Sequence, residues 1–408
     1  MRKGLRYFLL SALLLAVLIN VLAWNSSTFC DFYVSNIFPV WLNTYGKWTS
    51  RFPFSVGEIM IVLAVALLIV FVVFTLIAVI FCMSKKTKQK QEKWTSKAEY
   101  KWLHFRRNYG RYNAFFASLL VAITWIMTLN CYILYHCSTF EEKYWKHVAT
   151  KEDYTIEELG MLRDFVVTRA NQYAKMMERD ENGLILYDGN MEEEAIRAMQ
   201  NLGDVYPQLA GFYTTPKKIA ASEFLSQQYM KGYYFPFSLE ANYNDVMYIM
   251  SKPATMCHEL AHTKGFIYED EANLIGFLAC LHSDDILFQY SGYLSVLNYI
   301  DNDFYKSVGE NKQIYNSHVK ISSQVKKDRV FLTEDAWTKV EKKAVISTKT
   351  LKKASDTFTN TTLVLNGVEQ GSASYREVVG LLLDYYICMD DNRLKEEYTA
   401  QLTEESTR

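Results

Sequence analysis

The sequence lacks the features that identify several common protein classes. Its 44 lysines and arginines nearly balance its 45 aspartates and glutamates, so no excess of positive charge would attract a nucleic acid. It has no glycine-rich phosphate loop and no dinucleotide-binding fingerprint, which argues against the common nucleotide-binding folds. It also has no internal repeat and no low-complexity linker. We therefore expect no nucleic acid among its partners.

Cysteine is scarce and irregularly spaced. The chain has seven cysteines and no CxxC pair, so a cysteine-based zinc site is not expected. The odd number and uneven spacing also argue against a dense disulfide scaffold, although they are compatible with a single bridge. Cys257 can be read as a small buried residue or as a thiol switch.

Apolar residues, by contrast, make up half of the chain, and three long apolar runs occupy its first third. Each run is long enough to span a bilayer as a helix. The first follows Arg2, Lys3 and Arg6, as either a signal peptide or a retained anchor would; its length and the lack of a clear cleavage site favour an anchor. The predicted spans are residues 7–24, 59–83 and 114–135.

The distribution of positive charge predicts the orientation of these spans. Residues 84–113 contain ten lysines and arginines, whereas residues 25–56 contain only Lys47 and Arg51. Because positively charged loops stay in the cytoplasm, we expect the basic loop inside and everything after the third span outside. An RNA-binding patch is the other reading of the basic loop, but a topology signal that contacts the lipid bilayer accounts for it better. We thus expect a membrane domain (1–137) and an extracytoplasmic domain (138–408) on a bacterial cytoplasmic membrane.

The second domain is predicted to be α+β and mostly helical. Thr155 and Glu158 fit a capping box at the start of one helix, and residues 190–202 predict another. Residues 232–250 are aromatic and β-branched, which predicts one or two short strands. Residues 336–358 are basic and helical in pattern, residues 375–389 predict a final buried helix, and the tail after Asp390 is expected to fray.

The segment "CHELAHTKGFIYEDEAN" predicts a zinc site. His258 and His262 are four residues apart, so on a helix both imidazoles point to the same side. Neutral imidazole is a good zinc ligand, and catalytic zinc sites use three protein ligands plus water. In an HExxH site the intervening glutamate, here Glu259, reaches the zinc-bound water and acts as general base. Gly265 would let the chain turn sharply after the helix.

A third ligand is expected among the acids that follow. On a helix that starts near Tyr268, Glu269 and Asn273 share a face, while Glu271 points roughly 200° away from Glu269. We favour Glu269 as the ligand and Asn273 as a residue that orients the ligands, with Glu271 as the alternative. Acids in a first helical turn are also stabilised by the helix dipole, which needs no metal.

The HExxH motif followed by E-x-x-A-N resembles the gluzincin pattern of zinc metallopeptidases. That resemblance implies His258, His262 and Glu269 as ligands, Glu259 as general base and a zincin-like domain with a small sheet. The spacing departs from better-known gluzincins, because only six residues separate His262 from Glu269. Five blocks spread along the chain are more closely similar to the DUF3810 family of bacterial membrane proteins: residues 52–58, 232–244, 257–273, 290–294 and 366–375.

Other residues are placed by weaker arguments. A strand within residues 232–241 either lies in the core or offers an edge for main-chain hydrogen bonds to a peptide. Oxyanion stabilisation requires a donor near the metal, and the candidates are Tyr290, Tyr293 and Arg376. His282 and His318 are expected to be satisfied histidines rather than ligands.

The sequence as a whole predicts a membrane-anchored zinc metallopeptidase that hydrolyses a polypeptide outside the membrane. Two alternatives remain: an inactive receptor or structural protein that keeps the metal, and a zinc amidohydrolase that acts on cell-wall material. An intramembrane protease is rejected, because the residues that flank HExxH are too polar and the following apolar run is too short to span.

Overall fold

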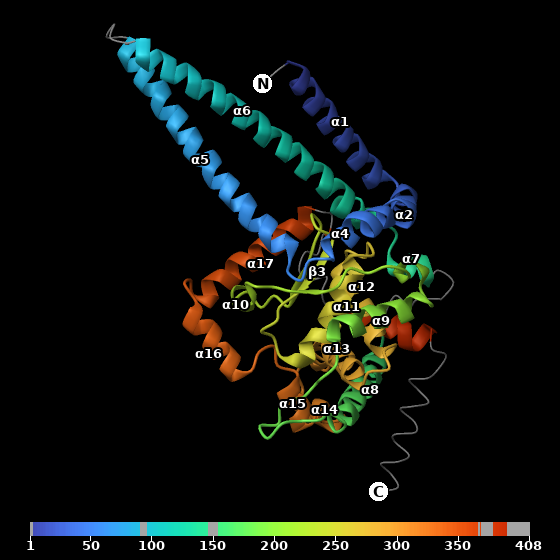
Figure 1. Cartoon of the computed structure of the whole chain (residues 1–408). Helices are drawn as coiled ribbons and strands as arrows, with labels where there is room; N and C mark the ends of the chain where they lie inside the picture. Colours follow the sequence, from blue (N-terminus) through green and yellow to red (C-terminus); the bar gives the residue numbers. More distant parts are fainter. Residues whose placement is uncertain (1–2, 90–95, 146–153, 366–367, 369–377, 390–408) are drawn as a thin grey trace, which may run out of the picture.

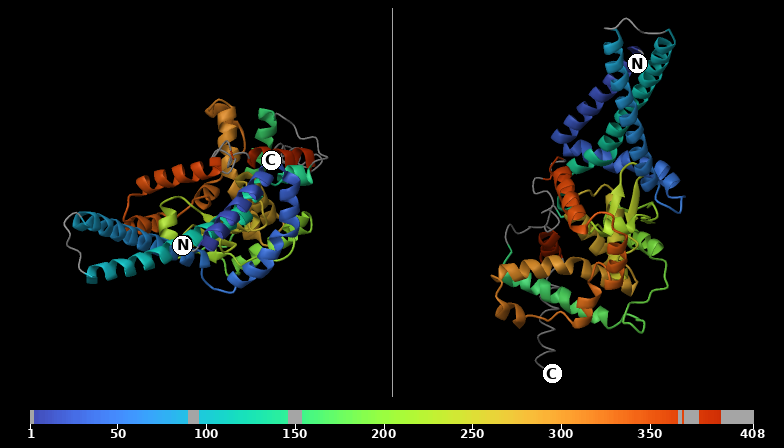
Figure 2. Two further views of the ribbon diagram at one scale, coloured as in Figure 1. Left: turned by 90° about the horizontal axis from the view of Figure 1, so that it is seen from above. Right: turned by 90° about the vertical axis from the view of Figure 1, so that its left-hand side faces the viewer.

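The computed structural model describes residues 3–89, 96–145, 154–365, 368 and 378–389. It is mostly helical, with one small sheet. Long helices project from one end of a compact helical body (Figure 1), and a second direction shows the same separation (Figure 2).

The three projecting helices match the predicted membrane spans. They are α1 (Lys3–Asn25), α5 (Val56–Gln89) and α6 (Ser96–Met127). A π-helical turn (Thr128–Tyr132) and a 3-10 turn (Leu134–His136) extend α6, and the apolar stretches of all three are long enough to cross a membrane. The start of α1, the end of α5 and the start of α6 lie at the same end, away from the body (Figure 1). The structure therefore confirms three helices that could span a membrane.

The segment between the first two spans packs against the body. It contains α2 (Ser27–Asn36), α3 (Phe38–Trp41), a π turn (Leu42–Gly46) and α4 (Lys47–Thr49). One apolar cluster joins this segment to residues from beyond position 137, so the predicted boundary at 137/138 divides a common core. The members of this cluster include Tyr33, Phe38, Leu42, Leu134, Leu239, Ile267 and Leu363.

The sheet has three short strands in the order β1-β3-β2. These are β1 (Lys217–Lys218), β2 (Gly232–Phe235) and β3 (Glu240–Tyr243). β1 runs parallel to β3, and β2 runs antiparallel to it, with Gly232 opposite Tyr243 and Phe235 opposite Glu240. β3 is buried while β2 is half-buried at the sheet edge, so residues 232–243 supply both a core strand and an edge strand.

A helical core surrounds the sheet. α11 (Lys252–His262) packs against α12 (Glu269–Leu281), which packs against α13 (Ile286–Ser307). α8 (Ile156–Ala174) begins with the predicted capping box, and α9 (Met191–Gly203) is the second predicted helix. The remaining helices are α7 (Phe140–Tyr144), α10 (Ser222–Ser226), α14 (Lys312–Ser317), α15 (Ser323–Asp328), α16 (Glu334–Lys343), α17 (Thr348–Leu365) and α18 (Val378–Leu383).

Two predicted helices differ from the structure in detail. The basic stretch 336–358 is broken into α16 and α17, because Ala344 is extended and the hydroxyl of Ser347 accepts a hydrogen bond from the Thr350 N–H in the first turn of α17. For the predicted final helix (375–389), the described part begins at α18, which is buried, and changes at Asp384 to a π turn (Asp384–Met389) that ends at the predicted residue. The tail after Asp390 lies outside the described residues.

Candidate metal centre

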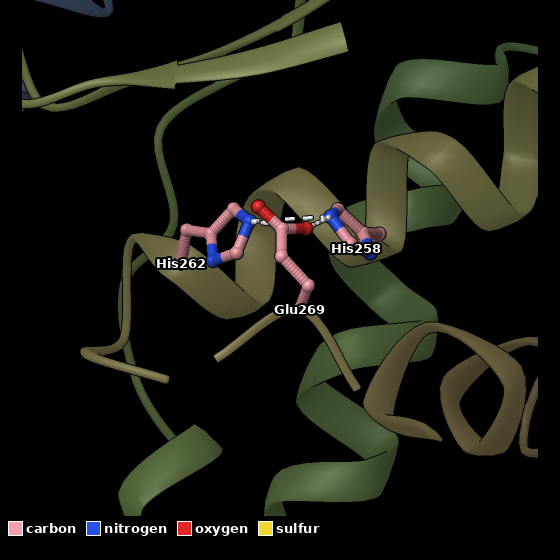
Figure 3. A group of neighbouring side chains, drawn as sticks. All are labelled: His258, His262 and Glu269. Atoms are coloured by element: carbon pink, nitrogen blue, oxygen red, sulfur yellow. Dashed lines mark hydrogen bonds and ion pairs between the residues drawn. The ribbon is translucent and has the colours of Figure 1, made fainter. Parts of the chain in front are cut away.

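The structure brings three predicted ligands together (Figure 3). His258 and His262 are one turn apart at the C-terminal end of α11, and Glu269 is the first residue of α12. The Nε2 atoms of the histidines are 3.2 Å apart, and Oε2 of Glu269 lies 3.1 Å from Nε2 of His258 and 3.8 Å from that of His262. Three donor atoms on two helices thus converge on one point.

The turn between α11 and α12 makes this convergence possible. Gly265 adopts a φ of 91°, a left-handed conformation that side chains disfavour. A Cβ at this position would also lie 2.4 Å from Cγ2 of Val34, in the segment between the first two spans. The predicted sharp turn at Gly265 is therefore confirmed, and it needs glycine for its backbone angle and for space.

A hydrogen bond fixes the orientation of His262. Its Nδ1 lies 2.7 Å from the carbonyl oxygen of Phe266, which can only accept. Nδ1 therefore carries the proton, and the lone pair of Nε2 points toward His258 and Glu269. Metal-ligating histidines in proteins commonly have this arrangement.

The donor set fits a zinc ion. Ligand atoms at about 2.1 Å from a tetrahedral zinc lie about 3.4 Å from one another, close to the three separations given above. Two imidazoles and one carboxylate are also ligands that zinc prefers. Within the described part of the chain, this is the one group of three or more such side chains whose donor atoms are close enough to share an ion.

Burial and the neighbouring carboxylate shift the pKa values of the two histidines in different directions. It lowers the pKa of His262 to about 4, with a further contribution from His258, so this imidazole is neutral near pH 7 as a metal ligand must be. Burial acts in the same direction on His258, but the carboxylate of Glu269 outweighs it and raises the pKa of His258 above its usual value. Metal binding at neutral pH would displace any proton held by this pair.

Glu259 lies beside the ligands with an unsatisfied oxygen. Its side chain is buried, and Oε2 has no hydrogen-bond partner among the described residues. Burial raises the pKa of Glu259 to about 8. A basic carboxylate that faces a cleft is suited to accept a proton.

The structure separates the other acidic and amide candidates. Asn273 lies one turn after Glu269, lines the cleft together with His258 and adds to the raised pKa of that histidine, as expected of a side chain that orients a ligand. Glu271 points elsewhere: its Oε1 accepts a hydrogen bond from the backbone N–H of Phe140. The alternative ligand therefore lies away from the two histidines.

Two of the three predicted oxyanion donors, Tyr290 and Tyr293, do not line the cleft. The hydroxyl of Tyr290 donates to Oδ2 of Asp328 inside the core, at 2.8 Å. Tyr293 packs against Phe165, Tyr173 and Phe277, so its ring is also part of the core. These two assignments were wrong because sequence spacing does not indicate which face of α13 meets the cleft. Arg376 lies outside the described residues.

Another face of α13 does line the cleft. It carries Leu294, Ser295, Asn298 and Tyr299, which are spaced as one helical stripe. Tyr299 is near enough to Glu269 for that carboxylate to raise its pKa, in addition to the effect of burial. Among 29 tyrosines, no pattern in the sequence distinguishes Tyr299.

The cleft itself has a volume of about 680 Å³ and contains the ligand cluster and Glu259. β2 forms one wall through Gly232, Tyr233 and Tyr234. A Cβ placed on Gly232 would lie 2.7 Å from Oε1 of Glu259, so the edge strand and the candidate general base are in contact. The arrangement can hold an extended chain beside a metal and a base.

Comparison with known protein families supports one of the two resemblances seen in the sequence, the one to the DUF3810 family. The model of the family "Protein of unknown function (DUF3810)" matches residues 33–383, which include the whole candidate centre. The chain belongs to the DUF3810 family. No curated protein and no solved structure matches it.

Proposed function

We propose that this DUF3810 protein is a membrane-anchored zinc metallopeptidase with a gluzincin-like site. One observation carries the proposal: three ligand side chains converge next to Glu259, whose free oxygen shares a cleft with an edge strand. A closed structural zinc site would normally use four protein ligands, whereas this cluster has three among the described residues.

The residues of the cleft have separate roles in this proposal. His258, His262 and Glu269 would hold the ion, which would supply an activated water and polarise the peptide carbonyl. Glu259 accepts the proton of that water and later delivers it to the leaving amine. β2 aligns the polypeptide substrate through main-chain hydrogen bonds at its open edge.

The site would lie outside the cytoplasmic membrane of a bacterium. Residues 84–113, which include the last turns of α5 and the first half of α6, hold ten lysines and arginines, and the positive-inside rule assigns them to the cytoplasmic side. The body of the protein lies at the opposite ends of α5 and α6 (Figure 1). This supports a zincin-like domain in the extracytoplasmic space.

Metal content tests the site first. We expect about one zinc per full-length chain purified in detergent, and a loss of zinc in both His262→Ala and Glu269→Gln. The full chain is used because residues 27–55 share an apolar core with the body. A folded protein that takes up no zinc would overturn the proposal, and zinc lost only in His262→Ala would exclude Glu269 as a ligand.

Hydrolysis tests the activity. The zinc-loaded protein is incubated with mixed-sequence peptides and, in parallel, with peptidoglycan fragments, and Glu259→Gln serves as the zinc-retaining inactive control. Cleavage of peptides by the wild-type protein alone is the expected result. If amide-linked cell-wall fragments were released and no peptide were cleaved, the proposed activity would be that of an amidohydrolase and not of a peptidase.

A further inference from the structure

One candidate membrane helix ends at the wall of the cleft. Cys131 and Tyr135, in the turns that extend α6, line the same cleft as His262. The side-chain amide of Asn130 donates a hydrogen bond to the carbonyl oxygen of Pro236, at 2.8 Å, just after β2. The end of one candidate span is thus part of the site.

The first turn of α5 is bound to the same sheet. The carboxylate of Glu240 accepts hydrogen bonds from the N–H groups of Val56 and Gly57, at 3.2 and 2.8 Å. It also pairs with Lys217 at 2.6 Å, and both side chains are buried. Such a pair is strongly destabilising to break, because each charge would be left buried alone. The start of the second span is therefore held rigidly on β3.

The segment between the first two spans carries the features of a membrane interface. Aromatic and apolar side chains are exposed on it although it is otherwise packed against the body. Tryptophan is enriched at the boundary between lipid and water, so this segment indicates the level of the bilayer surface. The exposed residues include Phe32, Val40, Trp41 (43% exposed), Trp48 (49%) and Phe54 (46%).

β2 connects the candidate base to that surface. At its first residue, a Cβ on Gly232 would be 2.7 Å from Oε1 of Glu259. At its last residue, the ring of Phe235 lies 2.7 Å from the position of a Cβ on Gly57, in the first turn of α5. Three residue steps of a strand cover about 10 Å. An extended chain aligned on β2 therefore passes from the catalytic residues to the end of a membrane span within a few residues.

From this geometry we propose that the substrate is a membrane-anchored polypeptide, cut in its extended segment next to the bilayer. The inference rests on the proposed peptidase function and adds the substrate class. The anchored chain leaves the membrane near the start of α5 and pairs with the open edge of β2. This places a bond about three to six residues from its own span at Glu259.

The position of the cleft can be tested without activity or metal. The full-length protein is reconstituted in vesicles of phosphatidylethanolamine and phosphatidylglycerol that carry acceptor dyes on their headgroups. A donor dye is attached through Asp356→p-azidophenylalanine, at the rim of the cleft, or through Lys312→p-azidophenylalanine, on α14 at the far end of the body (Figure 1). Strong energy transfer from position 356 and weak transfer from 312 is expected; equal transfer would overturn the placement at the surface.

Cleavage position tests the substrate class. Each probe is a single-span peptide whose outer linker contains three identical repeats, so that the same bonds occur at three distances from the bilayer. A panel of repeats with different compositions covers the unknown specificity. We expect the repeat nearest the membrane to be cut at least about tenfold more often than the distal ones, and a soluble copy of the linker to be cut more slowly still.

The outcomes separate the two proposals. Equal cutting of all repeats, or equally fast cutting of the soluble linker, would overturn the membrane-anchored substrate while the peptidase function stands. If the zinc-loaded wild type and Glu259→Gln both leave every probe and every soluble peptide intact, both proposals fail.

Discussion

Two polar clusters in the body of this protein each pair a histidine with a carboxylate, and they differ in what surrounds the pair. In the candidate metal centre, Nε2 of His258 is 3.1 Å from Glu269. On the other side of the core, Nδ1 of His318 is 2.8 Å from Oδ2 of Asp164, and this second group is here named the Asp164 cluster. A distance alone would not distinguish them.

The Asp164 cluster is satisfied by its own neighbours. Asp164 also binds Arg163 at 2.8 Å and the backbone N–H of Val319 at 3.2 Å, while Nε of Arg163 reaches Asp301 at 3.1 Å. Each charged side chain named in this cluster is paired with one of opposite charge, as expected of a structural network.

The candidate metal centre, by contrast, contains buried polar groups that have no hydrogen-bond partner among their described neighbours. Oε2 of Glu259 and Nδ2 of Asn273 are buried without a hydrogen-bond partner among the described residues. Two imidazole nitrogens also face each other, and the cleft opens onto them. Unsatisfied buried groups cost free energy, so two of them beside the three candidate ligands fit a site for a ligand better than a structural network.

The largest expected effect separates the two histidine pairs by zinc binding. His262→Ala should weaken zinc binding by more than about 100-fold, because it removes a ligand, whereas His318→Gln should leave zinc affinity unchanged. Competition with a chromogenic chelator measures both. If both variants lost zinc affinity to the same extent, zinc uptake would depend on the folded state in general and not on the candidate metal centre.

A change in the Asp164 cluster should lower the stability of the protein and not its zinc affinity. Arg163→Met removes the buried cation that Asp164 and Asp301 share and should destabilise the protein by about 3–5 kcal/mol. The matched change Glu259→Gln removes an unpaired buried acid and should not destabilise it. Denaturant unfolding in detergent, followed by the far-UV signal, compares the two; a larger loss in Glu259→Gln would contradict the distinction drawn above.

Asn273 offers a smaller and more specific test. Asn273→Ala should reduce zinc affinity by about tenfold, because it removes the polar side chain beside His258 that would orient this ligand. Asn171→Ala is the control, since Asn171 bonds only backbone groups near the Asp164 cluster. Isothermal titration of the metal-free proteins would measure the change, and an unaffected Asn273→Ala would show that the amide does not position the ligand.

The smallest effect concerns an acidic pair outside both clusters. Burial, and then the nearby Asp384, raise the pKa of Glu141 to about 7. A raised carboxyl pKa means that the folded state binds the proton more tightly, so this stabilisation is present below about pH 4.5 and is lost as the pH rises through 7. Since Glu141 is half-exposed, we expect it to contribute a fall in Tm of about 2 °C or less between pH 5 and pH 8. Glu259, whose pKa is raised to about 8, contributes in the same direction, so Glu141→Gln should reduce the total fall and not abolish it. An unchanged fall in the variant would contradict the assignment to Glu141.

Much of the candidate centre could be predicted from the sequence, because its rules are local. The spacing of His258 and His262 determines a shared helical face, and the favoured ligand Glu269, rather than Glu271, lies beside them in the structure. The three apolar runs and the charge of their loops likewise depend on composition over short stretches. Each of these conclusions follows from the number of residues per helical turn or from the length of helix that crosses a bilayer.

Other features were decided by contacts between distant parts of the chain. Tyr290 and Tyr293 turn into the core because helix packing selects which side of α13 meets the cleft, and no spacing encodes that choice. Glu240 joins the start of a candidate membrane span to the sheet across more than 180 residues. The sequence by itself therefore determined which side chains could bind a metal and which segments could enter a membrane. Only the tertiary structure brought the cleft to the ends of the candidate spans, because that placement depends on buried pairs formed between distant parts of the chain.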